Sequence, residues 1–263
     1  MNSPQLQHYV PAFHLRHFAH AQPEGLIAKR AREKYAVATT TVTPKGKVTH
    51  IDRSKVDKVA AALNIYDMYS SSRGDAEYIL SRIESSFAPY LPAIIEGAST
   101  GYQIELEPKA HRRLGMYLIS LVARQPRNLV NGTTQNLIRD ITENPTATAK
   151  LDFIDLLALI YDTKYYIVFR DVKILRSATP MAMPIGNPAI LDGNTIAVPL
   201  STNLMFIGDY YVQTSMLPTE KVIPVIDVKD YASTLLELTR LTRDDNTYVY
   251  NIELTDEIRP TLA

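Results

Sequence analysis

Polar residues with anion-binding chemistry follow the longest apolar run of the chain. The run covers residues 114–123, and Arg124, Gln125 and Arg127 come directly after it. At about half the length of a bilayer span, it predicts a buried helix that presents these groups at its end. Forked guanidinium donors match two oxygens of a phosphate or carboxylate. The segment is therefore a candidate anion site, although an arginine there also interacts favourably with the helix dipole.

Two glutamates are spaced so that they could act together. Glu77 and Glu84 are seven residues, or two turns, apart on a predicted helix, so both project from one face. Paired carboxylates can serve acid–base or metal chemistry. Arg73 and Arg82 lie nearby in the sequence, and salt bridges on a solvated face are the more common use of this pattern.

Histidines concentrate near the N-terminus. His8 is a candidate general acid or base because the ordinary pKa of imidazole lies near neutrality. His14 and His17 share a helical face and could in principle share a metal. No carboxylate precedes Glu24, and the spacing typical of zinc peptidases is absent. We therefore predict half-buried imidazoles on an amphipathic helix and no metal site.

Composition limits the remaining chemistry and the partners. The chain has no cysteine, which excludes disulfides, thiolate zinc sites and cysteine nucleophiles. We predict no α/β-hydrolase serine and identify no cofactor, although Ser177, at the end of a predicted strand, could line a site. Lys+Arg and Asp+Glu both number 28, which argues against a general DNA coat but permits a local basic site. Without a signal-peptide pattern in MNSPQLQHYV, we expect a cytoplasmic protein with no membrane partner.

Helices and strands must position these residues. Pro11 suits the first turn of a short helix to about residue 20, and Pro89 and Pro92 should bend or split a helix over 75–96. Further helices are predicted at 54–63, 108–125, 129–142, 151–162 and 228–241, and strands at 26–31, 35–42, 48–51, 165–175, 195–200, 204–207 and 248–254. Separate runs of strands and helices indicate an α+β fold. We predict an N-terminal β-hairpin, a central helical bundle and a C-terminal antiparallel β-rich section in a single domain, residues 1–263.

The opening segment also resembles a known family. Residues 7–18 read QHYVPAFHLRHF, similar to the start of the bacterial domain-of-unknown-function family 4238, with its His-Tyr-Val-Pro motif, an aromatic, Leu-Arg or Leu-Lys, and Phe. Similar motifs follow in the family's order at Glu77 with residues 80–84, at 123–127 and at 198–201. One position departs from the pattern, because the family's Ser-Asp-Asn-Pro is replaced by SATP at residues 177–180, with Ala178 at the place of the acid.

The resemblance brings no established activity, and two functions follow from the residues. The first is an enzyme, such as a nuclease, acting on nucleic acid, a nucleotide or another phosphate-bearing substrate. His8 would be the acid–base group, and Glu77 or Glu84 would orient it or a metal. The substrate-binding residues would be Tyr9, Arg16, Arg124, Gln125, Arg127 and Ser177. This function requires that the opening segment pack beside the helix at 75–96 and the end of the helix at 108–125.

The alternative is a non-catalytic protein-interaction module, associated with defence or mobile elements. Its active site would have degenerated at Ala178, and His8 and Tyr9 would be buried and hydrogen-bonded. A structural subunit of an assembly is also compatible with the neutral charge.

Overall fold

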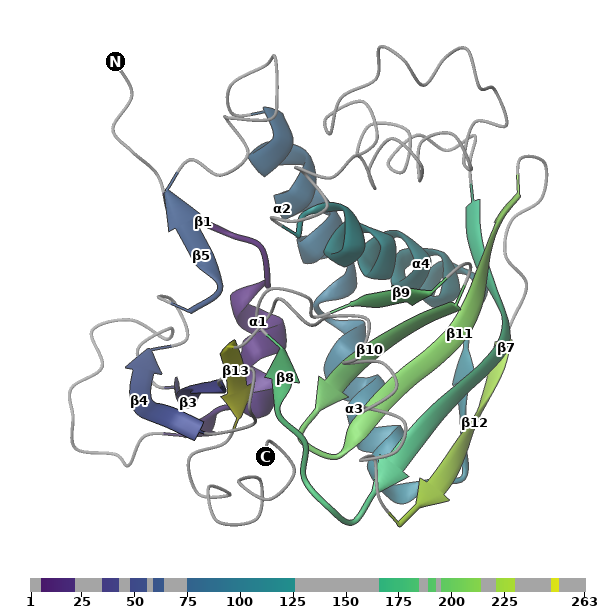
Figure 1. The fold of residues 1–263 in the computed structure, drawn as a ribbon. Helices are drawn as coiled ribbons and strands as arrows, with labels where there is room; N and C mark the ends of the chain where they lie inside the picture. Colours follow the sequence, from purple (N-terminus) through teal and green to yellow (C-terminus); the bar gives the residue numbers. More distant parts are fainter. Residues whose placement is uncertain are drawn as a thin grey trace.

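The computed structural model describes residues 6–21, 35–42, 48–55, 59–63, 75–125, 166–184, 189–192, 195–213, 221–229 and 247–250. Within these ranges the chain combines four α-helices, one 3-10 helix and two larger sheets (Figure 1). The helices are α1 (Ala12–Leu15), η1 (Arg16–Phe18), α2 (Asp75–Phe87), α3 (Tyr90–Thr100) and α4 (Pro108–Ala123). The predicted α+β class is therefore confirmed. No described helix combines the length and the apolar character that crossing a bilayer requires.

The larger sheet has six strands in the order β6-β12-β7-β11-β10-β9. They are β6 (Gln103–Leu106), β7 (Tyr166–Ser177), β9 (Ile190–Asp192), β10 (Thr195–Ser201), β11 (Leu204–Gln213) and β12 (Lys221–Val228). Neighbouring strands run antiparallel except β12 and β7, which pair in parallel. The predicted antiparallel section is thus corrected to a mixed sheet, because β12 joins β7 on the side opposite β11 and runs in the same direction as β7.

Strand β12 has no counterpart in the sequence-based prediction, and the helix predicted at 228–241 begins on its last residue. Ile223 and Val225 are buried, whereas Val222, Pro224 and Ile226 are exposed. This alternation is typical of a half-buried strand. Pro224 weakens the sequence signal for a strand, yet it lies where β12 changes its partner from β6 to β7.

The smaller sheet has the order β2-β3-β13-β8, with β4 paired to β3. Its strands are β2 (His20–Ala21), β3 (Tyr35–Val42), β4 (Val48–Lys55), β8 (Met183–Pro184) and β13 (Thr247–Tyr250). The strands predicted at 35–42 and 48–51 are confirmed. The strand predicted at 26–31 lies outside the described residues, so the N-terminal hairpin that it would form is not shown.

The helix predicted at 54–63 is wrong. Residues 48–55 pair with β3 along their whole length, and β5 (Ala61–Leu63) pairs with β1 (Leu6–His8). Backbone hydrogen bonds to strands distant in the sequence therefore replace the local bonds of a helix, which a reading of neighbouring residues cannot reveal.

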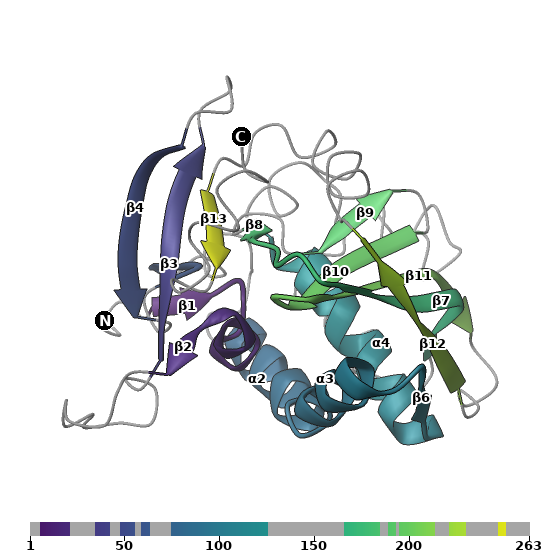
Figure 2. The same cartoon turned by 90° about the horizontal axis from the view of Figure 1, so that it is seen from below.

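Prolines divide the helices as predicted. Pro89 is the N-cap residue of α3, and the helix expected over 75–96 is split there into α2 and α3. Pro108 begins α4. Figure 2 shows α3 and α4 against one face of the larger sheet with α2 packed on α4, so the described part of the predicted bundle is a layer on a sheet. The helices predicted at 129–142 and 151–162 lie outside the described residues.

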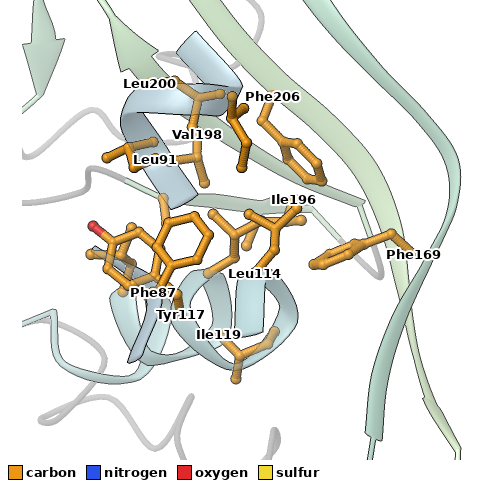
Figure 3. Packing of buried hydrophobic residues seen from close by; sticks show 14 of the residues in the cluster. Phe87, Leu91, Leu114, Tyr117, Ile119, Phe169, Ile196, Val198, Leu200 and Phe206 are labelled. Carbon is orange, nitrogen blue, oxygen red and sulfur yellow. The ribbon is translucent and has the colours of Figure 1, made fainter. Parts of the chain in front are cut away.

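Two apolar clusters form the core, one on each face of the larger sheet. The first joins the helices to one face and includes Phe87, Leu91, Leu114, Tyr117, Phe169, Ile196, Val198 and Phe206 (Figure 3). The second uses residues from the alternate positions of the same strands, and includes Val10, Leu15, Phe18, Leu175, Met183, Ala197 and Met205. Tyr9 packs against both clusters, so the opening segment lies where they meet.

Helix α4 approaches strand β7 closely at Gly115. A Cβ atom at this position would overlap the backbone oxygen of Ile167. Only glycine therefore allows the helix to lie this near the strand. The contact sets the distance between α4, which carries Tyr117 and Arg124, and the sheet.

Candidate functional site

The opening segment carries a histidine that is completely buried. Pro11 is the N-cap residue of α1, and His14 in this helix is directed inward, at 0% exposure. Its Nε2 atom donates to the carbonyl oxygen of Pro199, 2.7 Å away, since a carbonyl can only accept. In the neutral ring Nδ1 then has no proton, and it accepts from the hydroxyl of Tyr117 at 2.6 Å. One imidazole thus joins the opening segment to α4 and β10.

Burial determines the protonation of this pair. It lowers the pKa of His14 from 6.5 to about 4, and the positive charges of His17 and Arg124 act in the same direction, against the hydrogen bond to Pro199. The imidazole is therefore neutral at pH 7. Burial also raises the pKa of Tyr117 well above its ordinary value, so the phenol keeps its proton. The two groups form a neutral hydrogen bond across a buried interface.

Arg124, the residue that ends α4, is also completely buried. Its Nη1 atom donates to Oε1 of Glu84 on α2, at 2.6 Å, and to the carbonyl oxygen of His8, at 3.4 Å. Its Nε donates to the carbonyl oxygen of Ser120 and its Nη2 to the Ser120 hydroxyl, both at 3.3 Å. The side chain of Glu84 is 27% exposed. This arginine therefore joins α2, α4 and the opening segment.

The structure brings three predicted site residues together. His8, Glu84 and Arg124 come from three different elements and meet at the guanidinium, so the packing that the enzyme hypothesis requires is present. His8 contributes its backbone oxygen to this meeting point. Glu77 lies on α2, but the structure describes only its backbone. Arg127 lies outside the described residues.

The remaining predicted residues near α4 are engaged within the protein. Gln125 is completely buried, and its amide nitrogen donates to the carbonyl oxygen of Ala189 at 2.9 Å. Tyr9 is half-buried, and its backbone N–H donates to the carbonyl oxygen of Ala60 at 2.9 Å. Arg16 lies half-buried in η1. These contacts fix the backbone around the cluster.

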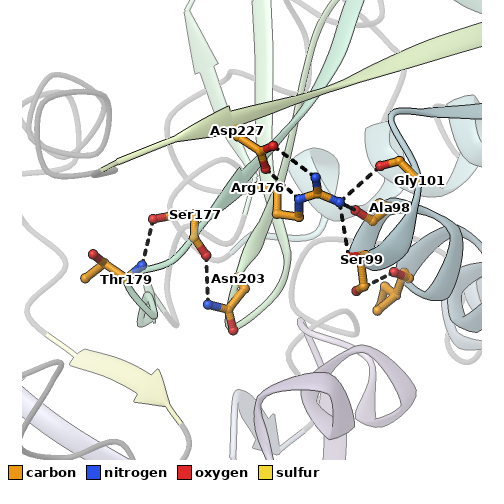
Figure 4. A network of polar contacts seen from close by, with 9 residues as sticks. Ala98, Ser99, Gly101, Arg176, Ser177, Thr179, Asn203 and Asp227 are labelled. Carbon is orange, nitrogen blue, oxygen red and sulfur yellow. Dashed lines mark hydrogen bonds and ion pairs between the residues drawn. The ribbon is translucent and has the colours of Figure 1, made fainter.

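Ser177 secures a turn at the end of β7. Its hydroxyl accepts from the backbone N–H of Thr179, and its carbonyl oxygen accepts from the side-chain amide of Asn203, both at 3.0 Å (Figure 4). The side chain is buried, whereas Ala178 beside it is exposed. Among its described hydrogen bonds, none connects Ser177 to the cluster around Arg124.

The pattern Gly-x-Ser-x-Gly occurs at residues 97–101, although we predicted no α/β-hydrolase serine from the sequence. The structure places it at the C-terminal end of α3, where the Ser99 hydroxyl donates to the carbonyl oxygen of Ile95 at 2.7 Å. A nucleophilic serine of that family requires a strand-to-helix turn instead. Carbonyl oxygens of this helix end accept from Arg176 of β7, which also pairs with Asp227 (Figure 4). The pattern therefore belongs to the hydrogen-bonded end of α3 and does not form a nucleophile turn.

The cluster binds its own members rather than presenting open groups. A guanidinium already bonded to a carboxylate cannot offer the same donors to a phosphate unless the buried pair breaks. Within the described residues there is also no group of three or more histidines, aspartates or glutamates placed to hold a metal ion. The arrangement can hold the opening segment firmly against α2, α4 and β10.

The roles of Tyr117, Ser120 and Pro199 were not predicted. Tyr117 and Ser120 lie three residues apart within the mostly apolar run 114–123 of α4, and Arg124 follows four residues later. Such spacing puts polar groups on one face, and a polar face in a buried helix indicates a polar partner. This signal was available in the sequence. The sequence holds no such signal for the acceptor at Pro199, because this residue lies 185 positions from His14.

Comparison with known proteins supports the resemblance of the opening motif. No curated protein and no solved structure matches the chain significantly. The model of one family, described as a protein of unknown function (DUF4238), matches residues 6–152. That region contains the side chains of His14, Glu84, Tyr117, Ser120 and Arg124, whereas the acceptor Pro199 lies beyond it. The chain belongs to the DUF4238 family.

Proposed function

We propose that the protein is a non-catalytic protein-interaction module. The observation that carries the proposal is the state of three of its six predicted substrate-binding residues. Arg124, Gln125 and Ser177 are all buried, and each uses its polar atoms on hydrogen bonds within the chain. A substrate phosphate would have to displace these contacts before it could bind.

The energy of the buried ion pair supports this proposal. Arg124 is 0% exposed and Glu84 27% exposed. Separating a buried pair costs about 3–5 kcal/mol, because one charge is left without its partner. A phosphate would need to recover that cost in addition to its own desolvation. The cluster is therefore better suited to holding the fold than to binding and releasing a substrate.

A surface of β12 favours a protein partner over nucleic acid. Val222 and Ile226 are 49% and 42% exposed and lie with Pro224 on the same outward face. Apolar side chains that gather on one strand face are typical of protein interaction sites. Nucleic acid is recognised chiefly by basic side chains, and the formal net charge of the chain is zero.

The test is a pull-down with the purified, tagged chain, followed by reconstitution of the complex from purified components. We expect one stoichiometric protein partner that is lost when Val222→Ser and Ile226→Ser are combined. Tyr78→Ser, on the exposed surface of α2 (63% exposed), is the matched control and should keep the partner. A partner-free, monodisperse protein that turns over a nucleotide would contradict the proposal.

A second candidate function is an enzyme acting on a phosphate-bearing substrate, and one observation favours it. His8, Glu84 and Arg124 converge although they are distant in the sequence, and Glu84 is partly open to solvent. If this function holds, His8→Ala should abolish nuclease or nucleotidase activity measured with several divalent metals, while circular dichroism shows an intact fold. An inactive wild-type protein under all these conditions would exclude it.

A further inference from the structure

The first helical turns of the chain depend on their surroundings for stability. Helix α1 has four residues and η1 three, far fewer than an isolated helix needs in water. They are held by the two hydrogen bonds of His14 and by the packing of Leu15 and Phe18 in the second apolar cluster. Loss of the His14 contacts would therefore weaken the docking of residues 12–18 before it affects the rest of the fold.

We propose that residues 12–18 form an acid-released latch, which His14 holds against α4 and β10 only while its imidazole is neutral. Protonation adds an N–H at Nδ1, where the Tyr117 hydroxyl already donates. The hydroxyl proton would have to turn away, and a positive charge would be placed in a fully buried site.

The neighbouring groups do not compensate for that charge. Helix α4 contributes the neutral phenol of Tyr117 and the positive charge of Arg124, and β10 contributes the carbonyl oxygen of Pro199. On the latch itself, His17 is a further basic group, beside Arg16. Glu84 on α2 is the acidic group in this set of contacts, and it is already bonded to Arg124.

The direction of the pH effect follows from proton linkage. The released latch exposes an ordinary imidazole with a pKa of 6.5, whereas the pKa of the docked imidazole is about 4. Between these values the released form binds more protons, so docking is strongest above pH 6.5 and weakens as the pH falls toward 4. At pH 5 the equilibrium should have moved toward release by about 30-fold relative to pH 7.5.

The absence of cysteine from the chain allows a direct test. Leu15→Cys places one thiol on the buried face of the latch, and Val198→Cys places one in the core of the larger sheet; both native side chains are fully buried. Labelling by 4,4′-dithiodipyridine, corrected for the pH dependence of the free thiol, should be about 30-fold faster at pH 5 than at pH 7.5 for Leu15→Cys. Val198→Cys should stay protected at both pH values.

Two variants assign the effect to its residue. His14→Gln keeps a donor for Pro199 but cannot be protonated, so its labelling should change less than about threefold over the same range. His17→Gln should retain most of the pH response, because burial lowers the pKa of His17 as well and this residue contributes only the smaller part. Phe18→Cys, also completely buried and within the latch, is the alternative reporter if Leu15→Cys does not fold.

Three results would overturn the latch. The first is a rate at Leu15→Cys that does not change with pH. The second is parallel labelling of Val198→Cys, which would indicate global unfolding. The third is a pH response that His17→Gln removes and His14→Gln keeps.

Discussion

Arg124 and Arg176 both connect the end of a helix to a carboxylate, but they do so in different surroundings. Arg124 is 0% exposed and makes a 2.6 Å contact with Glu84, which is 27% exposed. Arg176 is 21% exposed and makes two hydrogen bonds with Asp227, at 2.6 and 3.0 Å, although Asp227 is 62% exposed. Arg176 has the better hydrogen-bonding geometry, and Arg124 has the greater burial.

The difference shows why the count of hydrogen bonds does not rank the two sites. Water competes for every donor and acceptor of the exposed pair, so its net contribution is small. In the buried pair water reaches only the Glu84 side, and removing Glu84 leaves a desolvated charge on Arg124. We therefore expect the Arg124 site to determine the stability of the fold, and the Arg176 site to adjust the orientation of α3 against β7 and β12.

The largest expected effect comes from Glu84→Ala. Arg124 would keep its charge in a buried site without a carboxylate, which should lower the free energy of unfolding by about 3 kcal/mol. Urea denaturation followed by circular dichroism measures this loss. Glu96→Ala, an exposed position on α3, is the matched control and should change stability by less than about 0.5 kcal/mol. Equal midpoints for the two variants would mean that burial of Arg124 does not matter.

A smaller loss is expected from Tyr117→Phe. The phenylalanine ring keeps the stacking on Phe87, whose ring centroid lies 4.5 Å away, but the Nδ1 atom of His14 loses its donor inside the core. A buried acceptor without a partner costs about 1–3 kcal/mol, measurable by the same denaturation. Tyr78→Phe, on the exposed surface, removes a hydroxyl without this cost and should be neutral. An unchanged denaturation midpoint for Tyr117→Phe would show that the hydrogen bond between Tyr117 and His14 does not contribute to stability.

Asp227→Asn should have the smallest effect. It removes the exposed ion pair with Arg176, so the denaturation midpoint should fall slightly at low ionic strength and match the wild type in about 1 M NaCl, where surface charges are screened. The hydrogen bond from Arg176 lowers the pKa of Asp227 below its ordinary value of 3.8. Its contribution is therefore complete above pH 3.8 and is lost as the pH falls through the lower folded value. A loss as large as that of Glu84→Ala would reverse the ranking of the two sites.

Much of the fold was predictable where its causes are local. Pro89 and Pro108 mark helix boundaries because a proline removes a backbone donor wherever it occurs. The β-branched run at 35–42 became a strand as expected. The prediction failed at 54–63 and at β12, where pairing with distant strands decides the conformation.

Three residues of the cluster, His8, Glu84 and Arg124, were predicted to lie together, but their burial was not predicted. The polar residues of the opening segment, of α2 and of the end of α4 do converge, as the enzyme hypothesis required. Their burial depends on the closure of the whole core around Arg124, which residue type and spacing cannot report. For the same reason His14 could be recognised as a helix-face histidine but not as a bridge to Pro199.

Gly115 has a consequence beyond the space that it leaves for Ile167. The residue lies nine positions before Arg124, about 13 Å along the helix axis. Any side chain at position 115 would push α4 away from strand β7 at this contact and tilt the helix. The far end of the helix would then swing by more than the displacement at the glycine, and it would carry Arg124 away from Glu84. A substitution at a glycine that packs on the backbone of Ile167 would thus break an ion pair two and a half helical turns away.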